Sequence, residues 1–500
     1  MQDRVTRIVI AGGGTAGWMA AAALGQFLGD GYAITLVESD EIGTVGVGEA
    51  TIPQIRLFNE ALGLDEDAFL RATGGTFKLG IEFDGWRVPG DAYMHAFGDV
   101  GRDVGLIAFQ HYWLRARSLG LARPLDAYAM NEVAARAGRV RRGGPVTAPT
   151  IPAIPYAFHF DAGLYAAFLR RFALNRGVTR IEGRIATVER DGEGGDVAAL
   201  VLAAGARVEG DLFLDCTGFR GLLIEGALGT GYEAWTQWLP CDRAVAMPTA
   251  PMAAPPPYTR ASARAAGWQW RIPLQHRTGN GHVYCSGFTS DDAATATLIA
   301  HVEGEALAEP SPLRFTTGRR RKAWNRNVVA LGLASGFLEP LESTSIHLIQ
   351  SAIARLIKLL PTLPIAGAVR DAYNRETDFE IERIRDFLIL HYWANGRDEP
   401  FWQACRAVAL PDALVAKIEL WRAAGTITRD RDELFTEDGW LQVLVGQGVA
   451  AARHHPLADA IAVPDLGAYM ETLELLYRRE AQALPMHADF IARHCAMRAR

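Results

Sequence analysis

The chain has 500 residues, of which 49% are hydrophobic, and a formal net charge of −6. That length exceeds what one compact core usually holds, so we expect two or three packed units. The mixed charges leave no basic surface for nucleic acid, and the run Arg319-Arg320-Arg321-Lys322 is interpreted as a solvated face before a strand. We find neither a cleavable leader nor an apolar stretch of membrane-spanning length, and therefore expect a soluble, cytoplasmic protein with no membrane partner.

Cysteines and lysines are both scarce. The five cysteines form no CxxC pair, and their odd number argues against a disulfide framework, so we expect a reducing compartment and no metal site. Only four of the 51 basic residues are lysines. A lysine kept in apolar surroundings is thus a candidate for chemistry, because an amine can release its proton and a guanidinium cannot.

The first motif is a glycine-rich turn near the N-terminus. Residues 7–11 predict an apolar strand, residues 12–17 read G-x-G-x-x-G, and an alanine-rich helix follows. A second predicted strand, residues 33–37, leads into Glu38 at the spacing of about 20 residues seen in dinucleotide-binding βαβ units. The glycines admit a pyrophosphate, the helix N-terminus stabilises its charge, and Glu38 can accept from a ribose hydroxyl. This motif leaves FAD and NAD open.

Two later segments bear on the cofactor, and the second of them favours FAD. Closely spaced glycines between Gly43 and Pro53 are interpreted as backbone lying against a flat ligand, with a flexible loop as the alternative. Short predicted strands between residues 178 and 214 end in Asp215-Cys216-Thr217-Gly218. In flavoproteins with two dinucleotide-binding domains, a strand with this ending returns to the flavin domain.

Candidate site residues lie on predicted strands. Lys78 lies within residues 76–83, and its apolar neighbours Phe77 and Leu79 argue against the exposed position that is usual for a lysine. His95 and Phe97 share one face of an extended segment and are a candidate sandwich for a planar aromatic ligand. Trp268 and Trp270 likewise share a face. Ordinary core packing is the alternative for both pairs.

Residues 327–361 combine a strand, a glycine-rich loop and a helix. The strand spans residues 328–331, the loop runs through Gly332 and Gly336, and apolar residues then recur at helical spacing. Ser343 or Thr344 occupies the predicted N-cap position, so Glu342 lies just before the N-terminus of the helix. The free N–H groups at that N-terminus can bind an anion. An ordinary capped turn is the alternative.

These patterns predict an α/β fold of the two-dinucleotide-binding flavoprotein type, with a Rossmann-like FAD domain. Residues 1–370 are predicted to form the FAD-binding module, with inserted strand-rich segments at about 178–317. Residues 371–500 are predicted to form a mainly helical module that contributes to the substrate site.

The combination of motifs resembles the flavin-dependent halogenases of the tryptophan halogenase family over nearly the whole chain. The resemblance rests on the glycine-rich turn followed by Trp18, Lys78, and three runs: Gly46-Val47-Gly48-Glu49-Ala50-Thr51, Trp268-Gln269-Trp270-Arg271-Ile272-Pro273 and Glu339-Pro340-Leu341-Glu342-Ser343-Thr344. The WxWxIP hexapeptide is the specific signal, because many flavoproteins share the glycine motif.

The resemblance implies halogenation of an electron-rich, indole-like arene by way of hypohalous acid. Reduced FAD, supplied by diffusion from a separate NADH-dependent flavin reductase, would form a hydroperoxide with oxygen and oxidise chloride or bromide. The acid would pass through a tunnel to Lys78, which forms a haloamine or holds the acid by a hydrogen bond. Glu342 would activate the halogen or accept the arene's proton.

The resemblance and the motifs together assign further residues. Backbone N–H groups of Thr344 and Ser345 would hold the halide. His95, Phe97, Trp268, Trp270 and Ser343 would bind the substrate or gate its access. The cofactor would contact Gly12, Gly14, Thr15, Ala16, Gly17, Glu38, Gly48, Ala50, Leu333 and Gly336.

Two departures from the family pattern bear on the substrate. Ser345 stands where tryptophan-specific members usually carry glycine, although its backbone N–H stays available. No Tyr-Tyr pair for binding the amino-acid group occurs between Trp393 and Gly448. We therefore expect an indole-like or larger aromatic rather than free tryptophan, with a roomier site that favours bromide.

A single-component aromatic hydroxylase that uses the same flavin hydroperoxide is the alternative enzyme. It would react directly with NAD(P)H and would leave Lys78 without a role. A non-enzymatic flavin-binding protein is the third candidate. Whether the chain forms a homodimer is left open.

Overall fold

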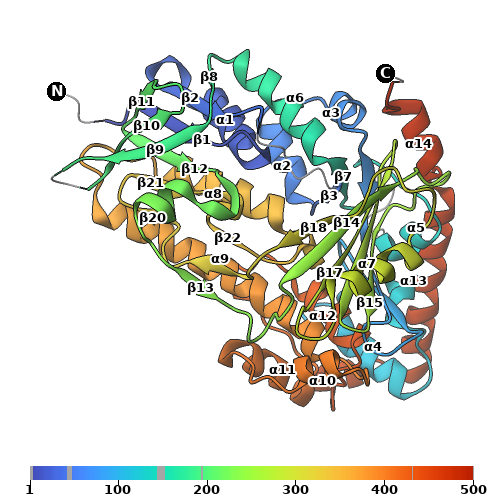
Figure 1. Cartoon of the computed structure of the whole chain (residues 1–500). Helices are drawn as coiled ribbons and strands as arrows, with labels where there is room; N and C mark the ends of the chain where they lie inside the picture. The colour runs from blue at the N-terminus through green and yellow to red at the C-terminus, as the bar shows by residue number, and fades with distance from the viewer. Residues whose placement is uncertain (1–3, 42–47, 144–152, 193–194, 431, 499–500) are drawn as a thin grey trace.

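The computed structural model describes residues 4–41, 48–143, 153–192, 195–430 and 432–498. One layer is a six-stranded sheet in the order β20-β21-β12-β1-β2-β8, in which only β20 pairs antiparallel (Figure 1). Its strands are β1 (Arg7–Ala11), β2 (Ala33–Glu38), β8 (Thr179–Glu182), β12 (Leu212–Asp215), β20 (Trp324–Asn325) and β21 (Val328–Ala330). The α/β fold with a Rossmann-like unit, predicted from the sequence, is confirmed.

The glycine motif lies between β1 and helix α1 (Thr15–Phe27), as predicted. A run of alanines on α1 is buried, which lets α6 (Ala162–Leu174) and α8 (Ser345–Lys358) pack closely on it. β12 pairs in parallel with β1, so the strand that ends at Asp215 returns to this sheet, as expected. The parallel strands are buried over most of their length, because α1 packs on one face of the sheet and apolar residues of β9 (Ile185–Arg190) and β10 (Val197–Leu202) pack on the other.

A second sheet has seven strands in the order β18-β14-β17-β16-β15-β5-β6. Its strands are β5 (Gly80–Asp84), β6 (Ala92–Ala96), β14 (Arg243–Thr249), β15 (Thr259–Arg264), β16 (Gly267–Pro273), β17 (Thr278–Tyr284) and β18 (Ser311–Arg314). A small sheet, β3-β7-β4, lies beside it and contains β3 (Gly48–Ala50), β4 (Thr76–Lys78) and β7 (Ala157–Asp161). The strand predicted over residues 76–83 is therefore two strands, divided at Leu79 and joined to different sheets.

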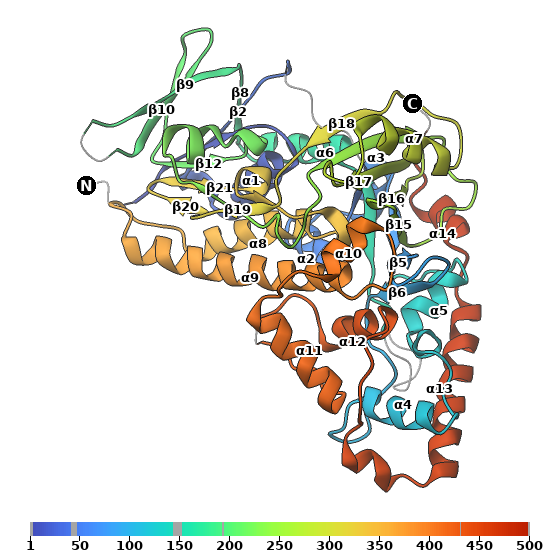
Figure 2. The ribbon, with the colours of Figure 1, turned by 60° about the horizontal axis from the view of Figure 1, so that its bottom comes forward.

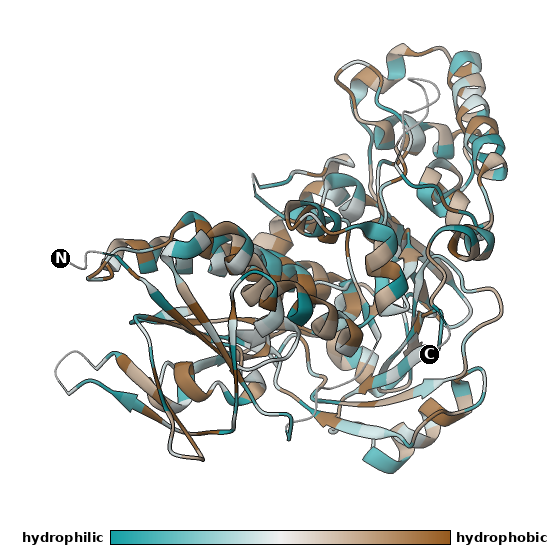
Figure 3. Cartoon of the chain, turned by 90° about the horizontal axis from the view of Figure 1, so that it is seen from above, coloured by the Kyte–Doolittle hydropathy of each residue, from teal (hydrophilic) through white to brown (hydrophobic). Residues whose placement is uncertain are grey.

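From residue 345 onward the elements of the described chain are all helices. The longest is α9 (Gly367–Trp393), followed by α10 (Pro400–Arg406), α11 (Asp412–Ala424), α12 (Glu437–Gly446), α13 (Val463–Ala483) and α14 (His487–His494). Figure 2 shows α11, α12 and α13 with α4 (Phe109–Ser118) in a lobe that extends away from the parallel sheet. In Figure 3 the strands near the N-terminus are largely brown, whereas the outer helices alternate between brown and teal.

The interpretation of the run at residues 319–322 as a solvated face holds for Arg321 and Lys322, which are exposed, but is wrong for Arg319 and Arg320. Arg319 and Arg320 belong to a strand, β19 (Gly318–Arg320), and their side chains are only 13% and 8% exposed. Arg319 pairs with Asp378 and Glu382 on α9, and Arg320 pairs with Glu225. Acids brought in by other elements compensate these charges, which the local sequence could not indicate.

Two further observations concern disulfides and membrane-spanning helices. All five cysteines are free. Among the described residues, no helix is both long and apolar enough to cross a bilayer.

Candidate active site

The turn between β1 and α1 requires glycine at two positions. Gly12 has φ of +107°, and a Cβ there would lie 2.4 Å from the Cys216 backbone oxygen. A Cβ on Gly17 would lie 1.9 Å from the Gly12 oxygen, whereas a Cβ on Gly14 would meet nothing within 4 Å. Thr15 opens α1, whose N-terminus receives no side-chain cap. The turn thus leaves open space and free N–H groups where a pyrophosphate would bind, which fits a dinucleotide.

Glu38 closes the other side of this turn. Its carboxylate accepts from Trp18 Nε1 at 3.1 Å and from Arg180 Nε at 2.6 Å. A Cβ on Gly13 would lie 1.5 Å from Glu38 Oε2, so the acid packs directly on the glycine turn. This is where a ribose-binding acid belongs in a dinucleotide fold.

Of the remaining cofactor candidates, some lie near the start of α1 and others pack against a different sheet. The loop after β21 reaches the start of α1, since a Cβ on Gly332 would lie 2.9 Å from the Ala16 Cβ, and this loop carries Leu333 and Gly336. Gly48 instead packs against Ile272 on β16, because a Cβ on Gly48 would lie 3.3 Å from that side chain, and Ala50 follows on the same strand as Gly48. Close strand packing therefore accounts for Gly48. The preceding glycines, residues 43–46, lie outside the described residues.

Lys78 is completely buried at the end of β4. Its Nζ donates to the Thr51 backbone oxygen at 2.9 Å and to Ser343 Oγ at 2.7 Å, and lies 5.3 Å from the centre of the Phe97 ring. Burial lowers the pKa of the amine to about 7, although the negative charge of Glu342 opposes the shift. A neutral amine that uses two N–H groups in these bonds retains a lone pair for an electrophile.

Ser343 has a strained backbone. Its φ of +61° is one of two positive values among the described non-glycine residues. That conformation costs roughly 1 kcal/mol for a side chain like serine and recurs at functional sites. The predicted cap at Ser343 or Thr344 is only partly right. Thr344 holds the N-cap position of α8, but its side chain forms no capping hydrogen bond. The Ser343 hydroxyl instead accepts a hydrogen bond from Lys78.

Two imidazoles hold the Glu342 carboxylate, one at each oxygen. His95 Nδ1, from β6, lies 2.8 Å from Oε2, and His391 Nε2, from the last turn of α9, lies 2.8 Å from Oε1. The His391 contact is poorly aligned for a hydrogen bond and is therefore mainly electrostatic. Burial alone would raise the pKa of Glu342, but the charges and contacts of the two histidines outweigh it and lower the pKa to about 2. Glu342 is thus an anion at neutral pH.

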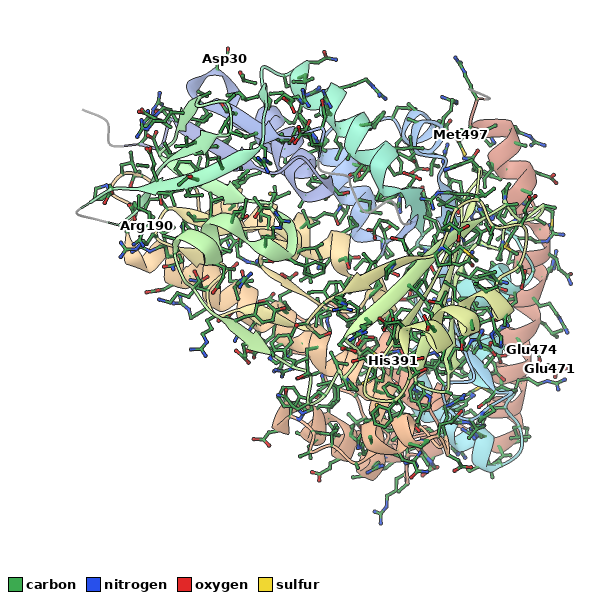
Figure 4. All side chains as sticks on the ribbon, in the orientation of Figure 1. Asp30, Arg190, His391, Glu471, Glu474 and Met497 are labelled. Atoms are coloured by element: carbon green, nitrogen blue, oxygen red, sulfur yellow. The ribbon has the colours of Figure 1, made fainter. Side chains whose placement is uncertain are left out.

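The contacts of His391 define where its protons lie. Its Nδ1 is 2.9 Å from the Phe387 backbone oxygen, so Nδ1 is the donor in that bond. With Nδ1 engaged in this bond, Nε2 is the nitrogen that faces Glu342 Oε1, at 2.8 Å. Figure 4 marks His391 among the crowded side chains at the lower centre of the molecule.

A second buried carboxyl, Glu339, lies three residues before Glu342. Its Oε2 accepts from Trp268 Nε1 at 2.9 Å and, through a short bond, from the Tyr392 hydroxyl, while its Oε1 has no partner in the described part of the chain. Burial raises the pKa of Glu339 to about 7 against the opposing effect of both donors. Trp268 and Trp270 lie together on β16, as predicted, with ring centres 6.2 Å apart.

The comparisons with known proteins bear directly on this arrangement of residues. The sequence model described as "Tryptophan halogenase" matches residues 7–463. The chain belongs to the tryptophan halogenase family. It is 36% identical to "7-chloro-L-tryptophan 6-halogenase KtzR" of Kutzneria sp. (strain 744), over 97% of this chain and 99% of that protein. It is also 36% identical to "Tryptophan 7-halogenase RebH" of Lentzea aerocolonigenes, over 85% and 84% of the two chains.

Solved structures of tryptophan halogenase relatives superpose along almost the whole chain. The flavin-dependent halogenase Xcc4156 from Xanthomonas campestris has a TM-score of 0.96 at 50% identity and covers 99% of this chain and 100% of its own. BrvH, a flavin-dependent halogenase from Brevundimonas sp. BAL3, has a TM-score of 0.95 at 46% identity, with 98% and 99% covered. The protein is therefore a flavin-dependent halogenase, which uses FAD, a halide and oxygen, and the hydroxylase alternative is not favoured.

Within this tryptophan halogenase fold, several residues that are distant in sequence meet. The structure brings Lys78, Phe97, Glu342 and Ser343 together, and His95 joins them through Glu342. The sequence analysis missed His391 and Tyr392 as partners of the two carboxyls. A signal was present: His391 ends the apolar segment Phe387-Leu388-Ile389-Leu390, and a histidine buried in such a segment needs a polar partner.

Proposed function

We propose that this enzyme halogenates an electron-rich, indole-like arene with hypohalous acid, and that Lys78 and Glu342 carry the reaction. The observation that carries the proposal is the environment of Lys78. A fully buried amine with a pKa of about 7 and both N–H groups engaged is a nucleophile prepared for an electrophilic halogen. An exposed lysine would be protonated and solvated at neutral pH.

When bound, the reduced flavin would donate two electrons to oxygen, and the oxygen activated in this way would oxidise the halide to hypohalous acid. The chain's own residues then receive and direct the acid. Lys78 would either form a haloamine, exchanging one N–H for the halogen with release of water, or donate the third N–H of its ammonium form to the acid. Before either step, Thr51 and Ser343 hold the amine in one position. The first free N–H groups of α8, at Thr344 and Ser345, support a halide site because they carry the positive end of the helix dipole.

Glu342 would take the proton that the arene releases when carbon–halogen bond formation is complete. The carboxylate is ionised and therefore able to accept it, and His95 and His391 hold its two oxygens in place. Halogen transfer leaves hydroxide from the acid, which the released proton converts to water. Orientation of the ring between Lys78 and Glu342 would then set which carbon reacts.

Trp268 and Trp270 are proposed to separate the arene from the flavin. Both rings are buried, at 1% and 6% exposure, and Trp268 is held by Glu339 through its indole N–H. A separate NADH-dependent flavin reductase is proposed to supply reduced FAD. Bromide is proposed as the favoured halide, and an indole-like or larger aromatic, rather than free tryptophan, as the arene.

A substrate assay tests the function. The protein, FAD, NADH, a generic flavin reductase and bromide or chloride are incubated with indole, and products are read by the mass shift and isotope pattern of the halogen. We expect a monohalogenated product that requires both halide and reductase. An oxygen-containing product with fast flavin reduction by NADH alone would instead support the hydroxylase.

A further inference from the structure

A histidine on the last helix of the chain contacts the strand that carries Lys78. His487 is the first residue of α14, which is red in Figure 1, and it is only 1% exposed. The Phe77 backbone N–H donates to His487 Nε2 at 3.1 Å. His487 Nδ1 lies 2.7 Å from the Pro255 backbone oxygen, so Nδ1 carries the proton and donates to that oxygen. One neutral tautomer therefore satisfies both ring nitrogens.

The position of β4 explains why a side chain is needed there. β4 lies at the edge of the sheet β3-β7-β4, and a buried N–H on such an edge must find an acceptor outside the sheet. The segment that approaches this edge is Pro255-Pro256-Pro257, and proline has no N–H to exchange with a strand. Pro257 accepts directly from the Leu79 backbone N–H, at 2.7 Å. The imidazole of His487 joins the remaining pair, Phe77 N–H and Pro255 C=O.

Helix α14 also holds the side chain of Phe77. Successive side chains of a strand point to opposite faces, so Phe77 faces away from Lys78. The Phe77 ring packs edge-on against Phe490 of α14, with ring centres 5.3 Å apart, and against His487 at 6.0 Å. The start of α14 is itself fixed, because the His487 backbone N–H donates to the Gly138 oxygen at 2.8 Å. One face of β4 is thus held by α14 while Lys78 extends from the other.

Lys78 therefore lies between two fixed peptide groups, one held by His487 and the other by Pro257. Burial lowers the pKa of His487 to about 4, so its ring is neutral at pH 7 and free to accept from Phe77 N–H. We propose that His487 is a positioning residue for Lys78, which holds the strand so that the amine meets the incoming hypohalous acid. This inference rests on the proposed function, because it explains how the proposed reacting lysine is held in place.

His487→Phe tests the inference by the fate of the oxidant. A phenyl ring keeps the contacts with Phe77 and lacks both polar atoms. The assay contains FAD, NADH, a flavin reductase, bromide, indole and an excess of 2-chlorodimedone, a β-diketone that free hypobromous acid brominates. We expect the variant to form about tenfold less bromoindole, as the loss of one buried hydrogen bond provides. Brominated β-diketone should rise by the same amount, because Lys78 captures less of the acid. General destabilisation would instead lower both products together.

Hydrogen exchange gives a second readout that needs no turnover. In His487→Phe the Phe77 amide loses its acceptor, so it should exchange about tenfold faster than in the wild-type protein. Mass spectrometry of peptides that span β4 measures this rate. FAD affinity should be equal in the two proteins, because His487 contacts β4 and the proline segment rather than the glycine turn.

His282→Phe is the matched control. His282 is also buried, at 2% exposure, its Nδ1 bonds with the Ala294 backbone oxygen at 3.0 Å, and burial lowers its pKa to about 4. It lies on β17, so its substitution should change neither the division of the oxidant nor the exchange of the Phe77 amide. His487→Gln is the rescue: an amide offers one donor and one acceptor, and should restore bromoindole formation to within about threefold of the wild-type rate.

The outcomes separate this inference from the proposed function. If His487→Phe divides the oxidant between indole and the β-diketone as the wild-type protein does, the inference is wrong and the halogenase proposal stands. An equal loss of bromoindole in His487→Phe and His282→Phe would also overturn it, because the effect would then be one of general stability. If the wild-type protein itself forms no brominated product, the proposed function fails, and the inference falls with it whatever the exchange rates show.

Discussion

Glu339 and Glu342 lie on one short loop, both are essentially buried, and their acidities are shifted in opposite directions. Glu339 has a pKa raised to about 7 and Glu342 a pKa lowered to about 2. Depth of burial does not explain the difference. The neighbours do: Glu339 receives two neutral donors, an indole N–H and a phenol, whereas Glu342 lies between two imidazoles.

Adjacent residues of α9 produce this contrast. His391 contacts Glu342, and Tyr392 donates to Glu339. A fully buried carboxylate without a charged partner would take up a proton, so the charge of the partners decides which acid is ionised at neutral pH. We therefore interpret Glu342 as the reactive base and Glu339 as a group that positions Trp268. The following substitutions test that division, beginning with the largest expected effect.

Glu342→Gln should lower kcat for bromination of indole by about 100-fold or more, because removal of a general base commonly costs roughly 10²–10⁴-fold. FAD affinity, measured by fluorescence quenching, should stay within about twofold, since Glu342 contacts His95 and His391 rather than the residues of the glycine turn. Loss of FAD binding in this variant would mean that Glu342 supports the cofactor site rather than the reaction.

His391→Phe should lower the rate at pH 7 by about ten- to 100-fold, the worth of one charge-assisted contact of roughly 1.5–3 kcal/mol. The phenyl ring fits among Phe83, Trp86 and Phe387, which contact His391. With His95 as its remaining histidine partner, Glu342 should have a raised pKa. The pH profile should then lose activity on the acid side at a higher pH than in the wild-type protein.

Tyr392→Phe is the control for that pH profile. It removes the hydroxyl that serves Glu339 and leaves the contacts of Glu342 in place. On the acid side, the pH profile of its bromination rate should coincide with that of the wild-type protein. An equal displacement in both variants would show that the two carboxyls are not independent, against our comparison.

Glu339→Gln should change the pH dependence of the free energy of unfolding more than it changes the rate of bromination. The native carboxyl, with its pKa raised from 4.5 to about 7, binds a proton more tightly than the unfolded one. Its contribution to the free energy of unfolding is therefore fully present below pH 4.5 and is lost as the pH rises through about 7. The full contribution is ~3 kcal/mol. Urea unfolding at pH 5 and pH 8 should show this loss in the wild-type protein and a smaller loss in the variant.

Glu342 should act on stability in the opposite direction. Its pKa falls from 4.5 to about 2 on folding, so its contribution is present above pH 4.5 and is lost as the pH falls toward 2.

The Glu339→Gln prediction has a clear contradicting outcome. If the free energies of unfolding of the wild-type protein and the variant differ by the same amount at pH 5 and at pH 8, the pKa of Glu339 is not raised.

The sequence predicted those parts of the site that depend on local pattern. The turn at Gly12 to Gly17 follows from spacing, and Lys78 was recognisable because lysine is rare in this chain and its neighbours are apolar. The environments of Glu339 and Glu342 were not predictable, because both carboxyls follow apolar residues and differ only through α9, some 50 residues later in the chain. The burial of Arg319 and Arg320 was missed for the same reason: their partners come from other elements.

The rate of indole bromination by Lys78→Met, measured beside its FAD affinity, tests the central claim most directly. Methionine keeps much of the apolar stem of Lys78 and lacks the amine that contacts Thr51 and Ser343. We predict normal FAD binding and a loss of bromination of about 1000-fold or more, as expected when the group that transfers the halogen is removed. Bromination near the wild-type rate in this variant would contradict the proposed role of Lys78.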